Sequence, residues 1–536
     1  MKWLMLFGAT FISTTRTGFR CLVKVGVSQS FSRAKFNCLD RSHQMKRKLT
    51  SKSARKGHEL ESGVISQDTS HRSPNFYDPI PYTCISGFQS KVACTKCLGE
   101  GQTQVRPSKK AQYQYKRDKQ AALERNEEIP QRPPLRIERC PICSGTGLVD
   151  AKTENQQYAC AQTVAIVGGG IGGLALALAL QQRRIPCVVY ERDSCFEERR
   201  QGYGLTMQQA VKALRSLGFY DNSKAEEGFG IHSKRHLVHT PDGEKVGEWG
   251  LKVWGRPQGK QEASRQNAHI PRQTLRRMLL DSLLPGTVMW GYKLVDFHEV
   301  MSSPDENAKS DSHSSVCLDL ECTSEGETGH KFVHHRASVL VGADGIRSSV
   351  RMLKLSDKKS YPLRYLDCIV VLGIAPSPKS ELTDGETVFQ TADGTTRLYA
   401  MPFASAGKEL AGAFTELQKE LCEVSIPHTI TSDSGETMWQ LSFPIDEVDA
   451  KRLSCKGANA LKEEALNRCG TWHAPIPELL NYTPASLVTG YPCYDCEVMS
   501  KRDLRVGSSP LGERSQVTLI GDAAHPMSPF KVSGMC

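Results

Sequence analysis

The sequence predicts an α/β protein with a doubly wound, mostly parallel sheet of the Rossmann type. Residues 163–193 read TVAIVGGGIGGLALALALQQRRIPCVVYERD, in which an apolar strand, a glycine-rich turn, an apolar helix and a second strand follow one another. Two later apolar runs, at 338–345 and 517–522, each pass from a strand into a turn that contains Gly and Asp. Short runs rich in β-branched residues are typical of buried parallel strands.

The glycine-rich turn is typical of a nucleotide-binding site. Gly168, Gly170 and Gly173 form the pattern G-x-G-x-x-G between the first strand and the helix. Such glycines permit a tight turn, a close approach of the backbone to a pyrophosphate, and close packing of helix on strand. Glu191 ends the second strand, at the spacing where an acidic side chain accepts hydrogen bonds from ribose hydroxyls. A merely structural strand–helix–strand turn is the alternative.

Composition and charge limit the class of protein. The chain has 536 residues, of which 39% are hydrophobic, so two or more domains with full cores are expected. The net charge is +11, but much of the excess is local, because residues 1–39 contain no Asp or Glu and 105–119 is a second basic run. We therefore expect solvated basic segments and no nucleic-acid binding. No apolar stretch reaches membrane-spanning length. The 19 cysteines show no disulfide framework, which favours a reducing compartment.

The first 40 residues are typical of a targeting leader. A short apolar run at 3–12 precedes arginines and lysines among Ser and Thr. This acid-poor composition is typical of organelle transit peptides, and the apolar start is also typical of a signal-peptide core. We expect import into a plastid or a mitochondrion; the alternative is a disordered N-terminus without a targeting role, and then a cytoplasmic protein. Residues 41–79 are polar and charged and are expected to be a linker.

Two matched cysteine pairs predict a small, separate zinc module at residues 80–150. The first pair, Cys94 and Cys97, and the second, Cys140 and Cys143, are each followed by two glycines in the pattern C-x-x-C-x-G-x-G. Each pair supplies two thiolates from one turn, and two pairs complete the tetrahedral sulfur set of a structural Zn²⁺ site. A redox dithiol pair or ordinary free cysteines are the alternatives.

The doubled unit resembles the cysteine-rich zinc domain of DnaJ-type chaperones. That domain has four such units and two zinc ions, whereas this chain has two units, which implies one zinc ion. The charged segment between the pairs is expected to form a helical insert on the surface. A zinc ion held by four cysteines has no open coordination position and does no chemistry itself.

Further candidate cofactor contacts follow the glycine turn in the chain. Arg272 stands where a helix is expected to begin, so that its guanidinium can reach a phosphate; a plain surface arginine is the alternative. Asp344 and Gly345 form the turn after the second apolar run, and Gly521 and Asp522 form the turn after the third. A carboxylate at the C-terminal end of a strand is well placed to accept hydrogen bonds from the hydroxyl groups of a bound nucleotide.

The three motifs in this order resemble those of the FAD-dependent aromatic-ring hydroxylases and epoxidases, the para-hydroxybenzoate hydroxylase-like flavoprotein monooxygenases. The resemblance covers about residues 163–530. It implies that the glycine turn holds the ADP part of FAD, that Asp344 and Gly345 contact FAD and NADPH, and that Gly521 and Asp522 bind the ribityl chain. The positions that match FAD-contacting positions of the family are Glu191, Arg192, Arg272 and Asp522.

The resemblance implies a monooxygenase that consumes NAD(P)H. NADPH, or NADH, would reduce FAD, and O₂ would then form a flavin C4a-hydroperoxide that hydroxylates or epoxidises a small hydrophobic or aromatic substrate. An aromatic ring, a quinone precursor and a polyene remain open as substrates. No side chain is expected to be a catalytic acid or base, and His525 is expected to be structural. The alternatives are a flavin-dependent reductase or oxidase, and an inactive flavoprotein that acts as a zinc-module interaction protein.

Strands within about 360–500 are expected to form a sheet over the substrate. Met401, Phe403, Trp439 and Phe443 are the candidates for lining the substrate site, with ordinary sheet core as the alternative for each. In the resembling family a long helix follows the third motif, but this chain reads Lys531-Val-Ser-Gly-Met-Cys536 there. We therefore expect that the C-terminal helix is missing because the last five residues are translated intron; a genuine truncation is the alternative.

Overall fold

The computed structural model describes residues 78–79, 91–150, 162–198, 203–207, 210–219, 230–250, 268–300, 315–323, 330–355, 361–404, 435–500, 503–504 and 515–526. The chain divides into two units, 1–73 and 74–536, and every described residue belongs to the second. The expected leader at 1–40, the expected linker except its last two residues, and the chain from 527 onward lie outside the described residues. The expectations about both ends therefore stay predictions.

A five-stranded parallel sheet carries the nucleotide-binding motifs. Its strand order is β13-β7-β6-β17-β23, and each pair of neighbours is parallel. Every residue of β6 and β7 is buried, because the sheet is covered on both faces. The predicted Rossmann-like sheet is confirmed. The strands span Val164–Val167 (β6), Cys187–Glu191 (β7), Val288–Trp290 (β13), Val339–Gly342 (β17) and Val517–Leu519 (β23).

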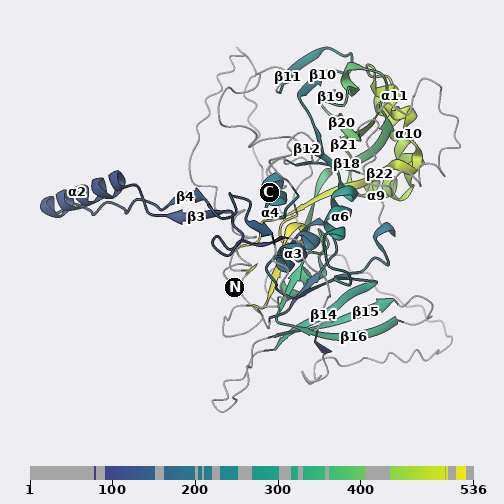
Figure 1. The fold of residues 1–536 in the computed structure, drawn as a ribbon. Coiled ribbons are helices and arrows are strands. Elements are labelled where there is room, and N and C mark those ends of the chain that lie inside the picture. Colours follow the sequence, from purple (N-terminus) through teal and green to yellow (C-terminus); the bar gives the residue numbers. More distant parts are fainter. Residues whose placement is uncertain are drawn as a thin grey trace, which may run out of the picture. The chain divides into compact units, whose positions relative to one another are not determined.

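Helices cover one face of the parallel sheet, and a mostly antiparallel sheet covers the other (Figure 1). The helix α3 (Ile171–Gln181) packs on β6 and β7 and against α6 (Arg272–Asp281). On the other face, alternate side chains of β6 and β7 share a buried core with β15. The covering sheet has the order β1-β16-β15-β14, with strands Asp78–Pro79 (β1), Tyr292–Val300 (β14), Ser315–Thr323 (β15) and His330–Ala337 (β16).

The segment expected to form the substrate sheet belongs to a seven-stranded sheet with the order β11-β10-β19-β20-β21-β18-β22. Two of its strands, β10 (Arg235–His239) and β11 (Lys245–Trp249), come from before the expected range of 360–500. The others are β18 (Leu363–Pro376), β19 (Thr387–Ala392), β20 (Arg397–Ala404), β21 (Glu436–Pro444) and β22 (Val488–Cys496). One face is covered by α9 (Glu447–Cys455), α10 (Ala458–Cys469) and α11 (Ile476–Tyr482) (Figure 1).

The two faces of this sheet separate the candidate substrate residues. Trp439 and Phe443 lie in the core beneath the three helices, so for these two residues the alternative of ordinary sheet core is correct. Met401 and Phe403 lie on the opposite face. That face meets a small sheet formed by β8 (Gly204–Met207), β12 (Ala268–Pro271) and β9 (Ile231–His232), which leads directly into α6.

The cysteine pairs lie in two short ribbons. Strand β2 (Lys91–Ala93) pairs with β5 (Leu148–Asp150), and β3 (Gln102–Val105) pairs with β4 (Arg136–Arg139), both antiparallel. The expected helical insert is α2 (Lys109–Arg125), which runs between β3 and β4 (Figure 1). Among the described residues, no helix is long and apolar enough to cross a membrane.

Candidate functional site

The turn between β6 and α3 requires its glycines. The φ angle of Gly168 is 110°, a region that side chains rarely adopt, and a Cβ atom there would overlap the Ala343 carbonyl oxygen. A Cβ atom on Gly173 would likewise overlap the carbonyl oxygen of Gly168. In contrast, a Cβ atom on Gly170 would have no neighbour within 4 Å. Two glycines therefore serve packing, and Gly170 leaves space over the start of α3.

The N-terminus of α3 is suited to an anion. Gly170 is its N-cap residue and provides no side-chain acceptor for the first N–H groups of the helix. Unpaired N–H groups and the positive end of the helix dipole together favour a phosphate group. This geometry fits the predicted pyrophosphate site.

Glu191 braces the glycine turn from the end of β7. Its Oε2 accepts a hydrogen bond of 2.6 Å from Gly169 N, and its Oε1 accepts one of 3.2 Å from Asp193 N. The side chain is buried, with 6% of the residue exposed. Each carboxylate oxygen has a second lone pair, so the predicted contacts with ribose hydroxyls are compatible with these bonds. The neighbouring Arg192 is exposed.

The second motif lies beside the glycine turn. Ala343 N donates a hydrogen bond of 2.7 Å to Val167 O, which joins the ends of β17 and β6. Asp344 accepts hydrogen bonds from the Ser348 hydroxyl and from Val350 N, and thereby holds the start of α7 (Ser349–Leu355). Gly345 has a φ angle of 80° and open space where a side chain would lie. The predicted contacts of Asp344 and Gly345 with FAD and NADPH stay predictions.

The third motif brings Asp522 towards Arg272 from a distant part of the chain. Asp522 lies in a 3-10 turn after β23, where Gly521 has a φ angle of 58°. Asp522 is exposed. The surrounding protein raises the pKa of the Asp522 carboxyl by desolvation, and the charges of His525, Arg272 and Arg351 oppose that rise.

Two tyrosines border this pair. The Arg272 guanidinium carbon lies 5.4 Å from the centroid of the Tyr203 ring. Desolvation raises the pKa of Tyr203 and of Tyr491, and in both cases the charge of Arg272 opposes that rise while the charge of Asp522 adds to it. Neither tyrosine was among the residues predicted from the sequence, because they stand in β-type segments without a recognisable motif.

Two buried arginines that sequence reasoning missed hold the motifs together. Arg276 Nε donates 2.9 Å to the carbonyl oxygen of Gly169 and so ties α6 to the glycine turn. Arg351 Nη1 donates to the carbonyl oxygens of Asp522 (3.2 Å) and Ala523 (3.0 Å). The spacing of Arg276 from Arg272, one helical turn, is a signal that places both on one face of α6. Arg351 has no such local signal.

The arrangement fits FAD. The strands β6, β7, β17 and β23 are parallel, so the turns that follow them lie at one edge of the sheet, where open α/β sheets bind their ligands. The residues predicted to contact FAD lie at the ends of those strands, in the turns that follow them, or in the first turn of α3 or α6: Gly168, Gly170, Gly173, Glu191, Arg192, Arg272, Asp344, Gly345, Gly521 and Asp522.

The four cysteines predicted to bind zinc lie together and are buried. Their sulfur atoms all lie within 4.8 Å of one another. The Sγ atoms are 3.8 Å apart for Cys94 and Cys140, and 3.6 Å apart for Cys97 and Cys143. A tetrahedral site with Zn–S bonds of ~2.3 Å has sulfur–sulfur edges of ~3.8 Å. The sulfur positions therefore fit Zn²⁺, and none of the four cysteines is in a disulfide.

The two cysteine turns have the same backbone contacts. Gly101 N donates to Cys97 Sγ and Gly147 N donates to Cys143 Sγ, both at 3.2 Å. These glycines have φ angles of 70° and 83°, and a Cβ atom on either would overlap a carbonyl oxygen of the other turn. The second glycine of each motif, Gly101 or Gly147, is therefore required for the close approach of the two turns.

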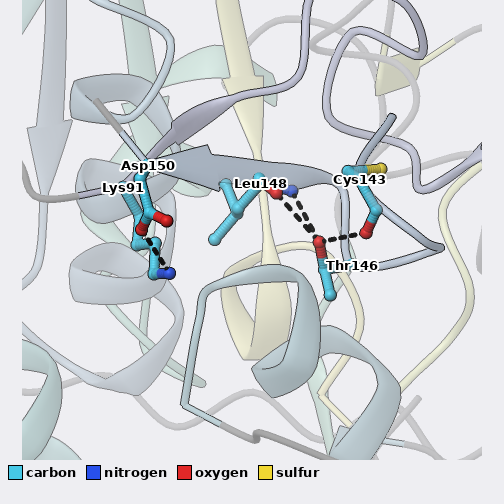
Figure 2. Close-up of polar contacts among 5 residues, drawn as sticks. All are labelled: Lys91, Cys143, Thr146, Leu148 and Asp150. Carbon is cyan, nitrogen blue, oxygen red and sulfur yellow. Dashed lines mark hydrogen bonds and ion pairs between the residues drawn. The ribbon is translucent and has the colours of Figure 1, made fainter. Parts of the chain in front are cut away.

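Polar contacts brace the second turn, as Figure 2 shows. Thr146 Oγ1 lies 2.7 Å from Cys143 O and 2.9 Å from Leu148 O, which holds the turn against the start of β5. Lys91 and Asp150 form an ion pair of 2.6 Å across the β2–β5 ribbon. The second cysteine turn and the β2–β5 ribbon are thus held in place by side-chain contacts.

Comparison with known proteins supports the FAD assignment. Residues 161–371 match the family described as FAD binding domain. The chain is 27% identical over 385 residues to an aurachin C monooxygenase/isomerase of Stigmatella aurantiaca, covering 70% of this chain and 77% of that protein. It is 26% identical over 378 residues to the phenazine 1,6-dicarboxylic acid hydroxylase PhzS of Lysobacter antibioticus, covering 69% and 78%.

A chloroplastic zeaxanthin epoxidase of an Oncidium hybrid cultivar is 25% identical over 376 residues, covering 70% of this chain but 46% of the epoxidase. The matched family segment contains the glycine turn, Glu191, Arg272 and Asp344. The sequence-based prediction that the chain is an oxidoreductase is thereby confirmed: residues 161–371 match an FAD binding domain, and the relatives above are named as a monooxygenase/isomerase, a hydroxylase and an epoxidase.

Proposed function

We propose that the chain uses NAD(P)H and O₂ to hydroxylate or epoxidise a small aromatic or hydrophobic substrate, with FAD as its cofactor. The observation that carries the proposal is the convergence of the glycine turn, Glu191, Arg272 and Asp522 at one edge of the parallel sheet. Bound FAD supplies the redox chemistry, which is hydride acceptance from NAD(P)H and activation of O₂. The chain itself has to hold the cofactor, exclude water and orient the substrate.

Each motif has a distinct task in holding FAD. The first N–H groups of α3 bind the pyrophosphate, and Glu191 accepts from the ribose hydroxyls. Asp522 accepts from the ribityl hydroxyls, and Arg351 fixes its turn through two carbonyl oxygens. Arg272, at the start of α6, places a permanent positive charge beside Asp522.

The side chains near Arg272 favour an aromatic ring as substrate over a polyene. Tyr203 immediately precedes β8 and packs against the cluster that contains Met401, whose Sδ is 3.8 Å from Thr206 Oγ1 and 3.9 Å from the Tyr399 hydroxyl. This combination offers the flat face of Tyr203 and the polarisable sulfur of Met401, which both suit contact with an aromatic ring. PhzS, whose name gives a phenazine dicarboxylic acid as its substrate, is a relative of this kind.

The test begins with the absorption spectrum of the purified protein, which should show bound flavin. Candidate phenols and nitrogen-containing aromatic acids are then compared with polyenes as stimulators of NADPH and NADH oxidation. The proposal requires oxygen uptake matched by an oxygenated product. Oxygen uptake that yields only hydrogen peroxide would instead identify an oxidase, and flavin reduction without oxygen uptake a reductase.

We further propose that Cys94, Cys97, Cys140 and Cys143 bind one structural Zn²⁺ ion. The sulfur spacing and the matched N–H donors support this assignment. Metal analysis should find one zinc ion per chain, and Cys143→Ala should lower it because three thiolates bind zinc more weakly than four. Equal zinc content in the wild type and in Cys143→Ala would show that the four cysteines are not the zinc site. An exposed cysteine outside the cluster, Cys455, gives the matched control Cys455→Ala.

We also propose that the first 40 residues direct the protein to a plastid or a mitochondrion, on the basis of their acid-poor composition. A fusion of residues 1–40 to a fluorescent protein should be imported into one of these organelles, and a cytoplasmic signal would contradict the proposal.

A further inference from the structure

The cysteine turns contact the flavin-binding helix. Ala93, the residue before Cys94, donates from its backbone N a hydrogen bond of 3.0 Å to Gln182 O, and Gln182 is the C-cap residue of α3. The last carbonyl groups of a helix have no partner within it, so this bond satisfies one of them. The opposite end of the same 11-residue helix forms the predicted pyrophosphate site.

A second contact is made by Arg183, the next residue. Its Nη1 donates 2.9 Å to Ala179 O in the last turn of α3. Its guanidinium lies against Gly99, so closely that a Cβ atom on this glycine would overlap it. Burial lowers the pKa of Arg183, and the charges of Cys97 and Glu100 raise it. The guanidinium thus lies between the helix end and the first cysteine turn.

A third contact lies beside these two. Gln182 is buried, and its Nε2 donates 2.9 Å to Leu217 O after α4 (Ala210–Ser216). A Cβ atom on Gly218 would lie 3.3 Å from Leu148 Cδ1, at the start of β5. The first cysteine turn therefore lies against the end of α3, and β5, which follows the second cysteine turn, lies against the turn after α4.

The charges explain why an arginine is needed at this place. One Zn²⁺ ion bound by four thiolates carries a net charge of −2, and the C-terminal end of α3 carries the negative end of the helix dipole. The zinc–thiolate cluster and the C-terminal end of α3 are both negative, so they would repel each other without a positive charge between them. The guanidinium of Arg183 lies between them: it donates to a carbonyl of the helix, lies against Gly99 and interacts electrostatically with Cys97, and an arginine is charged at any physiological pH.

We propose that Arg183 couples the zinc site to the flavin site: the zinc-loaded cysteine module caps α3 through this residue and thereby stabilises FAD binding at the other end of the helix. The inference rests on the proposed zinc and FAD sites. Arg183 is a positioning residue, since it contacts neither zinc nor FAD. Loss of zinc would loosen the cap on α3 and release FAD more readily.

The first test measures FAD retention in the full-length wild-type protein before and after zinc removal with a chelator. We expect FAD to dissociate about tenfold faster without zinc, the size of effect that follows when a charge-assisted contact is lost. Re-addition of zinc should restore slow dissociation. Equal FAD dissociation in both states would overturn the coupling while leaving both cofactor sites in place. Absence of zinc or of FAD from the wild-type protein would overturn the proposed function, and this inference with it.

The second test uses Arg183→Met, which keeps the aliphatic part of the side chain and removes the charge. We expect the variant to lose zinc to a colorimetric chelator about tenfold faster than the wild type, and we expect it to retain FAD less well. Arg183→Lys should recover part of both effects because it restores the charge. The control is the adjacent Arg184→Met, for which we expect wild-type zinc and FAD release. Unchanged zinc release in Arg183→Met, or an equal effect in Arg184→Met, would refute the role of Arg183.

Discussion

Glu191 links the backbone of the glycine turn to the expected ribose site. Removal of its charge by Glu191→Gln should weaken FAD binding by ~1.5–3 kcal/mol, which is about ten- to a hundredfold. Glu191→Ala should be worse, because Gly169 N then also loses its acceptor. Flavin content and FAD titration measure both effects, with the exposed Glu463→Gln on α10 as control. Unchanged flavin occupancy in both variants would show that the ribose site is elsewhere.

His269 gives the fold a dependence on pH. The residue is 1% exposed, and burial lowers the pKa of its imidazole to about 3, with the nearby His236 and His232 acting in the same direction. An imidazole in the unfolded chain titrates near pH ~6.5. Between this pH and about 3, the unfolded chain binds a proton that the folded chain does not. The contribution to stability is therefore complete above pH ~6.5 and is lost as the pH falls.

His269→Gln should reduce this acid sensitivity. Urea unfolding of the wild type should show a free energy of unfolding that falls between pH 7 and pH 5, and the slope should be smaller in the variant. The control is His298→Gln on β14, whose histidine is only partly buried. Equal slopes in wild type and His269→Gln would contradict the assignment.

At the scale of elements, the sequence predicted where strands lie but not which face each residue joins. The alternation along β21 places Trp439 and Phe443 on the same face, and this is visible in the sequence. Whether that face meets Met401 depends on the register of β20 against β21, in which Met401 pairs with Met438. Strand register is decided by contacts between distant segments, so a local pattern does not show it. For the same reason, the sequence did not show that β10 (Arg235–His239) joins this sheet beside β19.

The two faces of this sheet should respond differently to substitution. Trp439 is fully buried beneath the helices, and its Nε1 donates 2.8 Å to Thr483 Oγ1. Trp439→Phe should therefore lower the free energy of unfolding by ~1–3 kcal/mol and leave the KM for substrate unchanged. Met401→Leu conserves volume and should cost less than ~1.5 kcal/mol, but it should change KM because Met401 belongs to the cluster that Tyr203 packs against, and the Tyr203 ring lies against Arg272. A larger KM change in Trp439→Phe than in Met401→Leu would reverse the assignment of the faces.

At the scale of the whole molecule, the order of the motifs along the chain predicted the FAD-binding fold, and the matched cysteine pairs predicted their own cluster. The sequence did not predict the contact between them. Arg183 belongs to a short basic stretch after α3, and the sequence alone does not distinguish it from a surface arginine. Its role is visible only in the structure, where its guanidinium lies against Gly99. Arg351 likewise gains its partners, the carbonyl oxygens of Asp522 and Ala523, only when the sheet assembles. Interfaces of this kind are set by tertiary contacts that have no local pattern.

The helical insert should be dispensable for both cofactors. Within α2, which the structure describes in full, only Ala122 is buried, and Tyr113 is 72% exposed. Residues 106–135 can be replaced by a short glycine-containing turn, because Val105 and Arg136 are paired across the β3–β4 ribbon. The four cysteines and Gly99 remain in the shortened chain. Since tolerance to deletion follows from how little backbone and side chain is buried, we expect unchanged zinc content, FAD retention and Tm. A loss of zinc or of FAD in the shortened protein would mean that α2 supports the cysteine turns, and the contact through Arg183 would then not be sufficient to hold them on α3.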